Sequence, residues 1–315
     1  MIRLLRSLST LSPRSAEIQW RLVESVPAPT YNTGCTFCQP TFPPDKQINF
    51  DQNLNKSSRI PAKHVMVLTT KDNKMEHFES KIENWKGTLS NEIGKLKHKV
   101  PIAEGTSVSS IVLQNHDTVL QEEFGINHYS NPQHQLVFLY PDMKAIKFDI
   151  MYTDQFITKY IPQTQKTTVF NPFKKKRVEE EEEEEEEMRK PAQEINVDDA
   201  NFQETMIDKD LIVTCGHAKR DIRCGLLGPL ITNEFDKVLR KEGIRDDSYV
   251  GEITHIGGHA FAGNVLYYPK QCKSNHDFIW YGRVFPKDVQ GLVEETVKNK
   301  KIIQRLFRGD LSKYQ

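Results

Sequence analysis

The stretch DLIVTCGHAKRDIRCG, residues 210–225, decides the fold of the last third of this chain. Its apolar, β-branched start predicts a strand over 210–214 that ends at Cys215. Apolar residues at helical intervals then predict a helix over 226–242, which Gly243 terminates. One cysteine is therefore expected just after a strand and a second one just before a helix.

The rest of the C-terminal part continues with strands and one more helix. Further strands are expected over 249–255, 264–268 and 278–284. Pro286 then opens a final helix over 287–303, because proline is favoured in the first turn of a helix. The resulting order β-α-β-β-β-α is that of a thioredoxin-like layer of helices on a mixed sheet.

The N-terminal part shows a similar but weaker alternation. Short apolar runs predict strands at 64–69, 109–113 and 135–140, and helix-forming stretches lie at 85–100 and 153–160. Alternating strands and helices indicate an α/β fold. The expected fold class is α/β, with a thioredoxin-like C-terminal domain preceded by an N-terminal α/β domain.

A block of charge separates these two parts. Nine consecutive glutamates, 179–187, are flanked by lysine and arginine residues and cannot pack in a hydrophobic core. Such a block is typical of a disordered or helical tether, and a docking tail for a basic partner is the alternative. The predicted organisation is a presequence over 1–16, an N-terminal domain over 17–170, a charged linker over 171–195 and a C-terminal domain over 196–315.

The composition excludes several classes of protein. Lys plus Arg and Asp plus Glu both number 43, so the formal net charge is zero and no basic excess indicates a nucleic-acid partner. No segment approaches the roughly 18 uninterrupted apolar residues that a membrane span needs. Five cysteines in 315 residues do not resemble the disulfide framework of a small secreted protein.

The first 16 residues, MIRLLRSLSTLSPRSA, have the composition of a mitochondrial import sequence. They contain three arginines, four serines, four leucines and no acidic residue. A secretory signal fits less well, because no continuous apolar segment follows the basic start. We therefore expect a mitochondrial protein, imported into the matrix and cleaved near residues 14–16.

Cys215, Cys224, His255 and His259 form a complete ligand set for one metal centre. Two thiolates and two imidazoles suit either a tetrahedral zinc or a two-iron, two-sulfur cluster. Zinc fingers separate their cysteines by about two to four residues, whereas eight residues lie between Cys215 and Cys224. The wider loop favours a group larger than a single ion. Two free buried cysteines and a redox disulfide remain the alternatives for this pair.

The two histidines flank Gly257 and Gly258, which argue against a helix at this point. A glycine pair favours a tight loop that brings both imidazoles to one point. The zinc-protease motif places a glutamate directly after its first histidine, and Ile256 occupies that position here. A metallohydrolase is therefore disfavoured.

The loop between the two cysteines carries further groups. Arg220 and Arg223 favour the thiolate form of the cysteines. His217 follows Cys215 by two positions, as in half of a Rieske motif, but Leu227 stands where the second histidine of that motif would be. His217 is therefore expected to lie beside the ligands rather than among them.

Cys35 and Cys38 form a C-x-x-C motif in GCTFCQP. This spacing suits a redox pair or half of a metal site, and no second pair is evident to complete a metal site. The motif is a candidate catalytic redox pair, the alternative being two reduced thiols without a role.

Three motifs, TCGHAKRDIRCG, HIGGHAFAGN and WYGRVFP, together resemble those of the sucrase/ferredoxin-like family, whose C-terminal domain is a thioredoxin-like ferredoxin. The resemblance is strong over 205–285 and weaker over the N-terminal half, where IPAKHVMVLTT and the C-x-x-C pair fit. It implies a [2Fe-2S] cluster bound by Cys215, Cys224, His255 and His259. No pair of carboxylates suited to a glycosidase is recognisable.

These observations predict a mitochondrial iron–sulfur protein that transfers single electrons to redox protein partners, with a role in thiol redox homeostasis. It is expected to be an electron-transfer protein rather than a hydrolase. Neutral imidazole ligands place Rieske centres at about −150 to +300 mV, against about −400 mV for all-thiolate plant types. Because imidazole ligands can also release protons, a pH-dependent potential is expected. The alternatives are a zinc-stabilised binding module with the same ligands and a thiol–disulfide oxidoreductase that uses the C-x-x-C pair.

Overall fold

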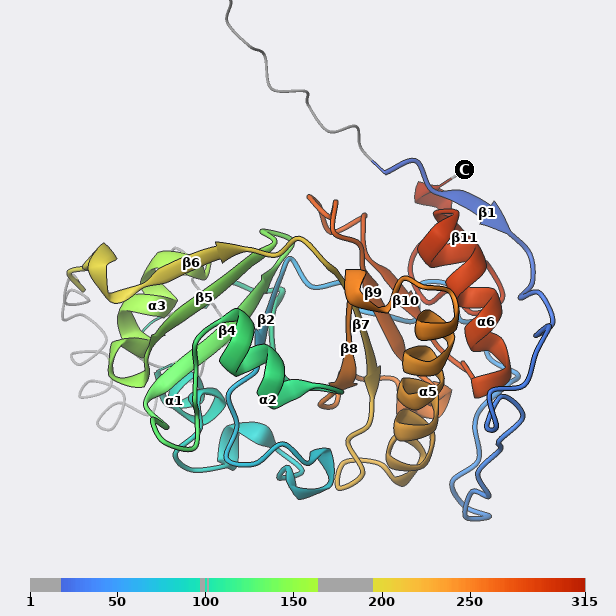
Figure 1. Ribbon diagram of the computed structural model, residues 1–315, viewed down its shortest axis with the longest axis horizontal. Helices are drawn as coiled ribbons and strands as arrows, with labels where there is room; N and C mark the ends of the chain where they lie inside the picture. The colour runs from blue at the N-terminus through green and yellow to red at the C-terminus, as the bar shows by residue number, and fades with distance from the viewer. Residues whose placement is uncertain (1–17, 97–99, 101, 164–194, 315) are drawn as a thin grey trace, which may run out of the picture.

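The computed structural model describes residues 18–96, 100, 102–163 and 195–314 (Figure 1). The predicted import sequence over 1–16 and the run of glutamates over 179–187 lie outside these residues. Within them, no helix is both long and apolar enough to cross a membrane.

Nine strands form one mixed sheet in the order β10-β9-β7-β8-β3-β2-β4-β5-β6. Their bounds are β2 Lys63–Val67, β3 Thr106–Leu113, β4 His134–Tyr140, β5 Lys144–Asp149, β6 Gln203–Met206, β7 Asp210–Cys215, β8 Ser248–Ile253, β9 Val265–Tyr268 and β10 Ile279–Tyr281. A separate parallel pair joins β1 (Arg21–Val23) to β11 (Lys301–Ile303).

The nine-stranded sheet runs through both parts of the chain. Strand β3 of the N-terminal part pairs antiparallel with β8 of the C-terminal part, which places Ile111 opposite Ile253. At the far edge β6 pairs with β5, with Glu204 opposite Ile146. The chain thus forms one further strand on the N-terminal part before it enters β7. The predicted division into two domains and a linker stays a prediction.

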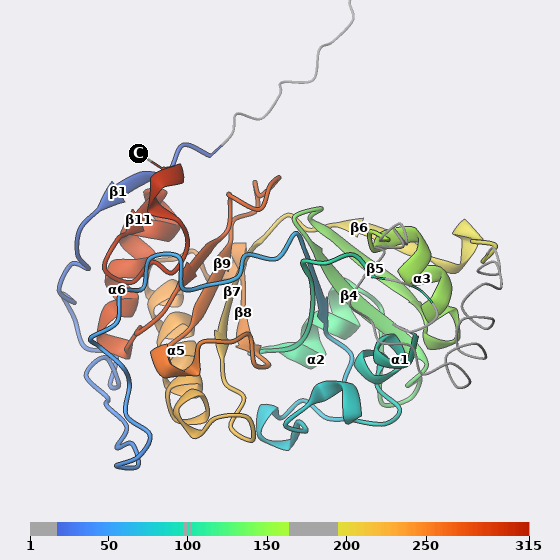
Figure 2. The same cartoon turned by 180° about the vertical axis from the view of Figure 1, so that it is seen from behind.

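Helices lie against both halves of this sheet (Figures 1 and 2). They are α1 (Leu89–Leu96), α2 (His116–Thr118), α3 (Thr153–Tyr160), α5 (Ile222–Lys241) and α6 (Val289–Leu292). Helices α1 and α3 pack together beside the strands of the N-terminal part, and α5 packs on β7, β8 and α6. The molecule therefore has α/β layers along its whole length.

Strand β2 shows how the two faces of the sheet are used. Val65 and Val67 pack into a core that contains residues of α1 and α3. Met66, between them, points to the opposite face, because side chains alternate along a strand. It belongs to the larger core, which also contains Cys215 and Cys224. The candidate ligands are thus part of the main hydrophobic core.

The structure confirms the α/β class and the order β7-α5-β8-β9-β10-α6 over the C-terminal part. Two predicted helix starts were wrong. Helix α1 begins at Leu89 rather than near 85, because the Thr88 hydroxyl accepts the Asn91 N–H at 3.3 Å as a cap. Helix α5 begins at Ile222 rather than 226, since the Asp221 carboxylate accepts the Arg223 N–H at 3.0 Å.

The predicted helix over 287–303 is wrong beyond Lys298. A π-helical turn, Val293–Lys298, ends the helical region. The side-chain amide of Asn299 donates to the Glu294 carbonyl at 2.7 Å, and Lys300 adopts a left-handed φ of 51°. The chain then turns into β11. The short strands β1 and β11, and β5 and β6, were not predicted; β6 is exposed throughout and has no apolar pattern.

His64 on β2 is a buried histidine that predicts how stability depends on pH. Its Nδ1 and Nε2 lie 2.8 Å and 3.0 Å from the hydroxyls of Tyr268 and Ser109. Burial lowers the pKa of His64 to about 3. Between about pH 6.5 and 3 the unfolded chain therefore binds a proton that the folded protein excludes. The stability from this group is complete above pH 6.5 and is lost as the pH falls.

We expect His64→Gln to flatten the pH dependence of the free energy of unfolding between pH 6.5 and 4. The expected difference in slope from wild type is at most about 1.4 kcal/mol per pH unit, the value for one proton. Urea unfolding at a series of pH values measures it, with the exposed His276→Gln as the matched control. A His64→Gln slope equal to that of wild type would contradict the assignment.

Candidate metal centre

Strand β7, helix α5 and the segment after β8 bring three candidate ligand side chains together. Cys215 is the last residue of β7, Cys224 lies in the first turn of α5, and His255 follows β8 by two residues. One ligand atom of each lies within 4.8 Å of the other two. Both cysteines are buried and His255 is half-buried. The predicted positions just outside the strand and helix were wrong, because both elements extend to include their cysteine.

Gly228 allows the first turns of α5 to reach the end of β7. A Cβ atom at this position would lie 2.7 Å from the carbonyl oxygen of Cys215 and 2.6 Å from the Cα of Gly216. Any larger residue would push the helix away from the strand. The helix N-terminus carrying Cys224 therefore lies directly beside Cys215, where the positive end of the helix dipole favours a thiolate.

His259 lies next to this group but outside it. Its ring centroid is 5.5 Å from that of His255, and the side chain is exposed. It begins the short 3₁₀ helix η7 (His259–Phe261), directly after Gly257 and Gly258 with φ values of 91° and 71°. The loop expected from the glycine pair is present. The role of His259 as a fourth ligand stays a prediction.

The two thiols share their protons unequally. A hydrogen bond from Cys224 holds the pKa of Cys215 well below its ordinary value, and His255 contributes to the same lowering. The contact with Cys215, together with burial, raises the pKa of Cys224. Cys215 is therefore the thiol that gives up its proton more readily, and Cys224 the one that keeps it. A metal ion would replace the remaining proton.

The donor set fits a metal or a cluster. It offers two thiols, which are soft donors, and an imidazole. The Nδ1 atom of His255 is buried and has no hydrogen-bond partner in the described part of the chain. Such an orphaned buried polar atom is costly unless a partner is supplied. The arrangement of these atoms alone does not distinguish zinc from an iron–sulfur cluster.

His217 holds the start of the segment that carries His255 and His259, called the histidine loop below. Its Nδ1 accepts the backbone N–H of His255 at 3.1 Å, and the side chain is buried. The ring packs edge-on against Phe78 with centroids 6.4 Å apart. His217 is not one of the three residues whose ligand atoms converge. It lies beside the group and sets where the backbone of His255 begins to turn.

Arg308 braces the loop from the inside and was missed in the sequence. It is 2% exposed. Its guanidinium donates to the Gly257 carbonyl at 3.3 Å, to the Ser57 carbonyl at 2.8 Å and to the side chain of Asn264. It also lies 4.8 Å from the ring of Trp280. The arginine occurs in an unremarkable LFRGD stretch, so only the tertiary structure identifies it.

The charged form of Arg308 is stabilised by the thiol pair rather than by a carboxylate. Burial lowers the pKa of Arg308 to about 10, and Cys215 and Cys224 act against this lowering. Within the described residues its hydrogen bonds go only to neutral groups. A buried cation without a counter-charge is strongly disfavoured. The structure is therefore consistent with a negatively charged group at the cysteines.

Among the basic residues of the cysteine loop, Arg223 acts to lower the pKa of Cys224. Arg223 forms an ion pair with Asp221, with Nε 2.9 Å from Oδ1, so its charge is balanced. Arg220 is exposed. The expectation that loop cations favour thiolate is supported for Arg223, and Arg308, a residue more than 80 positions away in the chain, adds a buried positive charge.

Glu252 on β8 is an acidic residue close enough to Cys215 for the two groups to interact. Its carboxyl lies against Gly216, where an added Cβ would be 1.7 Å from Oε2. The Oε2 atom is buried without a hydrogen-bond partner among the described residues. Burial, followed by the nearby Cys215, raises the pKa of Glu252 to about 7. The carboxyl therefore adds little negative charge below neutral pH.

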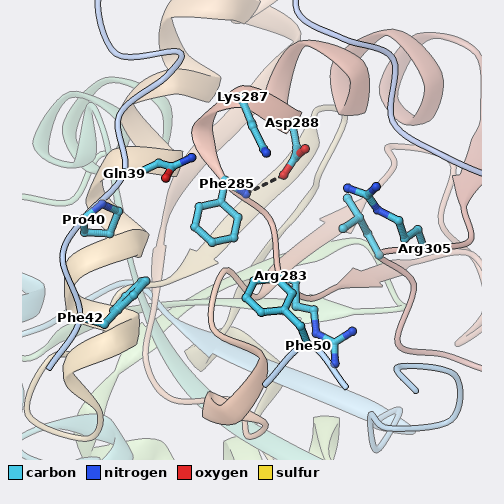
Figure 3. A pocket seen from close by; sticks show the side chains of 10 residues that line it. Gln39, Pro40, Phe42, Phe50, Arg283, Phe285, Lys287, Asp288 and Arg305 are labelled. Carbon is cyan, nitrogen blue, oxygen red and sulfur yellow. Dashed lines mark hydrogen bonds between the residues drawn. The ribbon is translucent and has the colours of Figure 1, made fainter. Parts of the chain in front are cut away.

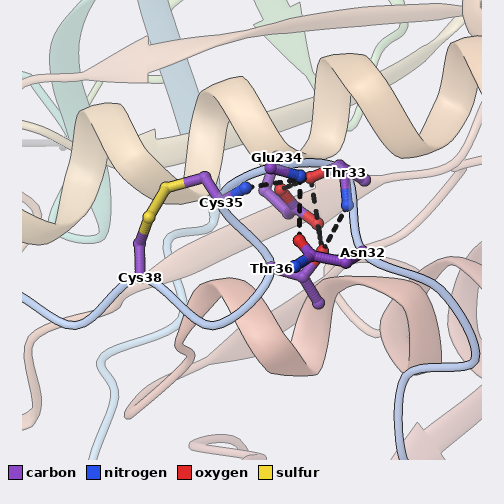
Figure 4. The surroundings of a disulfide bond; sticks show 7 residues. Asn32, Thr33, Cys35, Thr36, Cys38 and Glu234 are labelled. Atoms are coloured by element: carbon purple, nitrogen blue, oxygen red, sulfur yellow. Dashed lines mark hydrogen bonds between the residues drawn. A yellow bond between two sulfur atoms is a disulfide. The ribbon is translucent and has the colours of Figure 1, made fainter.

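Cys35 and Cys38 are joined in a disulfide, with their Cα atoms 4.8 Å apart (Figure 4). The loop is fixed to α5 through Glu234, which accepts hydrogen bonds from the hydroxyls of Thr33 and Thr36. Glu234 and Thr36 are fully buried. The pair is separate from the converging metal ligands, and its redox role stays a prediction.

The comparison with known proteins identifies a family. The family model described as sucrase/ferredoxin-like matches residues 54–309. Three curated proteins named altered inheritance of mitochondria protein 32 are similar over most of both chains. They come from Meyerozyma guilliermondii (41% identity, 92% of this chain and 95% of the relative), Debaryomyces hansenii (38%, 85% and 89%) and Clavispora lusitaniae (36%, 91% and 95%). No solved structure matches the chain.

We expect Arg308→Met to loosen the histidine loop. Carbonyl and amide oxygens that lose their donor cost about 1–3 kcal/mol each when buried. Hydrogen exchange of the Phe261 and Ala262 amides, which donate to Gly258 and His259 carbonyls, should accelerate by about tenfold or more, since tenfold corresponds to about 1.4 kcal/mol.

Arg245→Met is the matched control for this experiment. Arg245 is also buried and donates to the carbonyl of Ser248 at 2.7 Å. Its replacement should loosen the start of β8 and leave the amides of the histidine loop near their wild-type exchange rates. Equal protection of the loop in wild type and Arg308→Met would contradict the bracing role.

Proposed function

Because the chain belongs to the sucrase/ferredoxin-like family, we propose that it is a mitochondrial redox protein that holds a [2Fe-2S] cluster and transfers single electrons. The observation that carries this proposal is the convergence of Cys215, Cys224 and His255 within 4.8 Å. These side chains come from three different elements of the fold. Their convergence in the main core supports a common ligand rather than three unrelated roles.

Cys215 and Cys224 would bind one iron, and His255 and His259 the other. Bound in this way, the cluster supplies a one-electron redox couple. The chain holds the ligands in place: α5 presents Cys224 to the end of β7, and His217 and Arg308 hold the histidine loop at the backbone of His255 and Gly257. The exposed His259 would complete the set from the solvent side.

The charges around the site suit an anionic group. Deprotonation of both thiols would place two negative charges in the core, which is costly without compensation. Arg308 supplies one buried positive charge from within the protein. The raised pKa of Glu252, about 7, limits the negative charge that this carboxyl adds. The site is therefore prepared for thiolates rather than for neutral thiols.

The histidine side of the site provides the contact with a redox partner. His259 is exposed, and a cavity of about 190 Å³ opens beside His255 and His217, with Arg220 on its rim. Neither cysteine lines this cavity, and both are buried. A partner protein that docks at this opening would approach the imidazole of His255 rather than the thiolates.

The proposed location is the mitochondrial matrix. The curated relatives carry a name that refers to the inheritance of mitochondria. The first 16 residues have the arginine-rich, acid-free composition of an import sequence.

A zinc-stabilised module with the same ligands is the second candidate. Three ligand atoms within 4.8 Å of one another also suit a single tetrahedral ion. In that case the site would stabilise the fold and would not change its oxidation state.

We expect anaerobically purified protein to be reddish-brown, with visible absorption and, after reduction, an EPR signal. His255→Cys should retain the colour, change the EPR signal and lower the midpoint potential, because a thiolate replaces a neutral imidazole. His276→Cys, at an exposed loop position, is the control and should leave spectrum and potential unchanged.

Two outcomes would overturn these assignments. A colourless protein with one zinc per chain would identify the zinc module instead. An EPR signal that is identical in wild type and His255→Cys would remove His255 from the ligand set. Iron, sulfide and zinc analysis of the same samples distinguishes these results from simple loss of the group.

We expect residues 1–30 to direct a fused fluorescent protein into mitochondria. The reason is the arginine-rich, acid-free start of the chain, which favours import. Replacing Arg3, Arg6 and Arg14 by glutamine in the same fusion should abolish import. Cytosolic fluorescence of the unaltered fusion in live cells would contradict the proposal, and protease protection after outer-membrane rupture tests the matrix location.

A further inference from the structure

A pocket of about 620 Å³ lies between the N-terminal segment and the residues around α6 (Figure 3). Its volume falls in the range of small-molecule sites, roughly 300–1,000 Å³. One wall comes from residues 39–50 and the other from residues 283–306. It is separate from the convergent ligands, none of which lines it.

The pocket combines aromatic walls with an excess of positive charge. The rings of Phe50 and Phe285 are stacked, with centroids 6.4 Å apart and planes at 16°. Lys287 and Arg305 line the same pocket and are exposed. Asp288, which contributes a carboxylate to the pocket lining, is buried and accepts the Phe285 N–H at 2.9 Å. An anion with a flat or apolar body would complement such a lining.

The disulfide lies at the edge of this pocket. Gln39 and Pro40, which line it, directly follow Cys38. The exposed Phe37 lies between the two cysteines, and both cysteines are half-buried at the surface. In Figure 4, Cys35 lies toward the contacts of Glu234, and Cys38 lies farther from them. Cys38, directly before Gln39 in the pocket wall, is therefore the cysteine nearer to the pocket along the chain.

We propose that the Cys35–Cys38 disulfide and this pocket together form a thiol-exchange site for small thiols that carry a carboxylate. The carboxylate would lie against Lys287 and Arg305, and the apolar body against Phe50 and Phe285. The site goes beyond the proposed electron-transfer function, because it requires neither a metal nor any of the metal ligands.

The exchange is balanced by two molecules of thiol. The first thiolate attacks Sγ of Cys38, which forms a mixed disulfide and breaks the Cys35–Cys38 bond. The bonding electrons leave on Cys35, which takes up a proton. A second thiolate attacks the sulfur of the first thiol and releases Cys38 as a thiolate, which is protonated in turn. Two small thiols are oxidised to one disulfide, and the protein disulfide is reduced to two thiols.

The test compares two probes that differ only in charge, 4-mercaptobenzoate and 4-mercaptobenzamide. The full-length protein is mixed with each probe, samples are quenched by alkylation, and mass spectrometry of the peptide with Cys35 and Cys38 measures the rate of reduction. Each variant is compared with wild type for the same probe, so the intrinsic reactivity of the probe cancels.

We expect the double variant Lys287→Gln/Arg305→Gln to slow reduction by mercaptobenzoate by about tenfold, the lower end of electrostatic enhancement in charged clefts. Reduction by mercaptobenzamide should stay within a factor of two of wild type. The control is Lys95→Gln/Lys159→Gln, which removes the same charge from α1 and α3 and should leave both rates unchanged.

Two results would overturn the proposal. If the pocket variant slows reduction by both probes equally, the pocket does not recognise the carboxylate. If the control variant slows reduction by mercaptobenzoate as much as the pocket variant does, the effect does not come from the pocket. A second measurement tests the attacked sulfur: the oxidised, disulfide form of mercaptobenzoate should label Cys38 in Cys35→Ser faster than Cys35 in Cys38→Ser. The reverse order would overturn the assignment of Cys38. Loss of the metal centre would change none of these results, so failure of the two proposals can be distinguished.

Discussion

The backbones of α5 and β7 approach each other more closely than most side chains would allow. Gly228 faces the carbonyl of Cys215 and the Cα of Gly216, where a Cβ atom would fall below 3 Å from both. This approach places a thiol of the helix beside a thiol of the strand inside the main core. The histidine loop, the position of Arg308 and the charge of the site all depend on that contact, since each is arranged around the paired cysteines.

The sequence predicted those elements that depend on residues close together in the chain. The DLIVT run, the apolar periodicity of α5 and the glycine pair at 257–258 each correspond to an observed feature. The start of α5 was missed because the apolar helical periodicity begins only after Gly225, whereas the Asp221 cap and the packing on β7 hold the helix from Ile222 onward. Tertiary packing overrode local propensity at this point.

The residues of the candidate site also fall into two groups, those that the sequence identifies and those that it does not. The cysteines and histidines are recognisable because their residue types are themselves the chemical signal. Arg308 has no such signal, since its partners Ser57, Gly257 and Asn264 lie 44 to 251 positions away. The pocket beside the disulfide is equally invisible in the sequence, because its walls are formed by the two ends of the chain. Contacts over such separations are set by the fold and not by the spacing of residues.

The pairing of β3 with β8 has a consequence for how this protein can be divided. Residues 111–113 cover one side of β8 along 251–253, directly before the histidine loop. A fragment that began after the glutamate run would leave this side of β8 as an open row of backbone donors and acceptors. Open edges of this kind pair readily with other chains. Shortened forms of the protein would therefore tend to self-associate through β8, the strand that leads into the histidine loop. Cutting the chain between its two halves and separating them would expose the same edge.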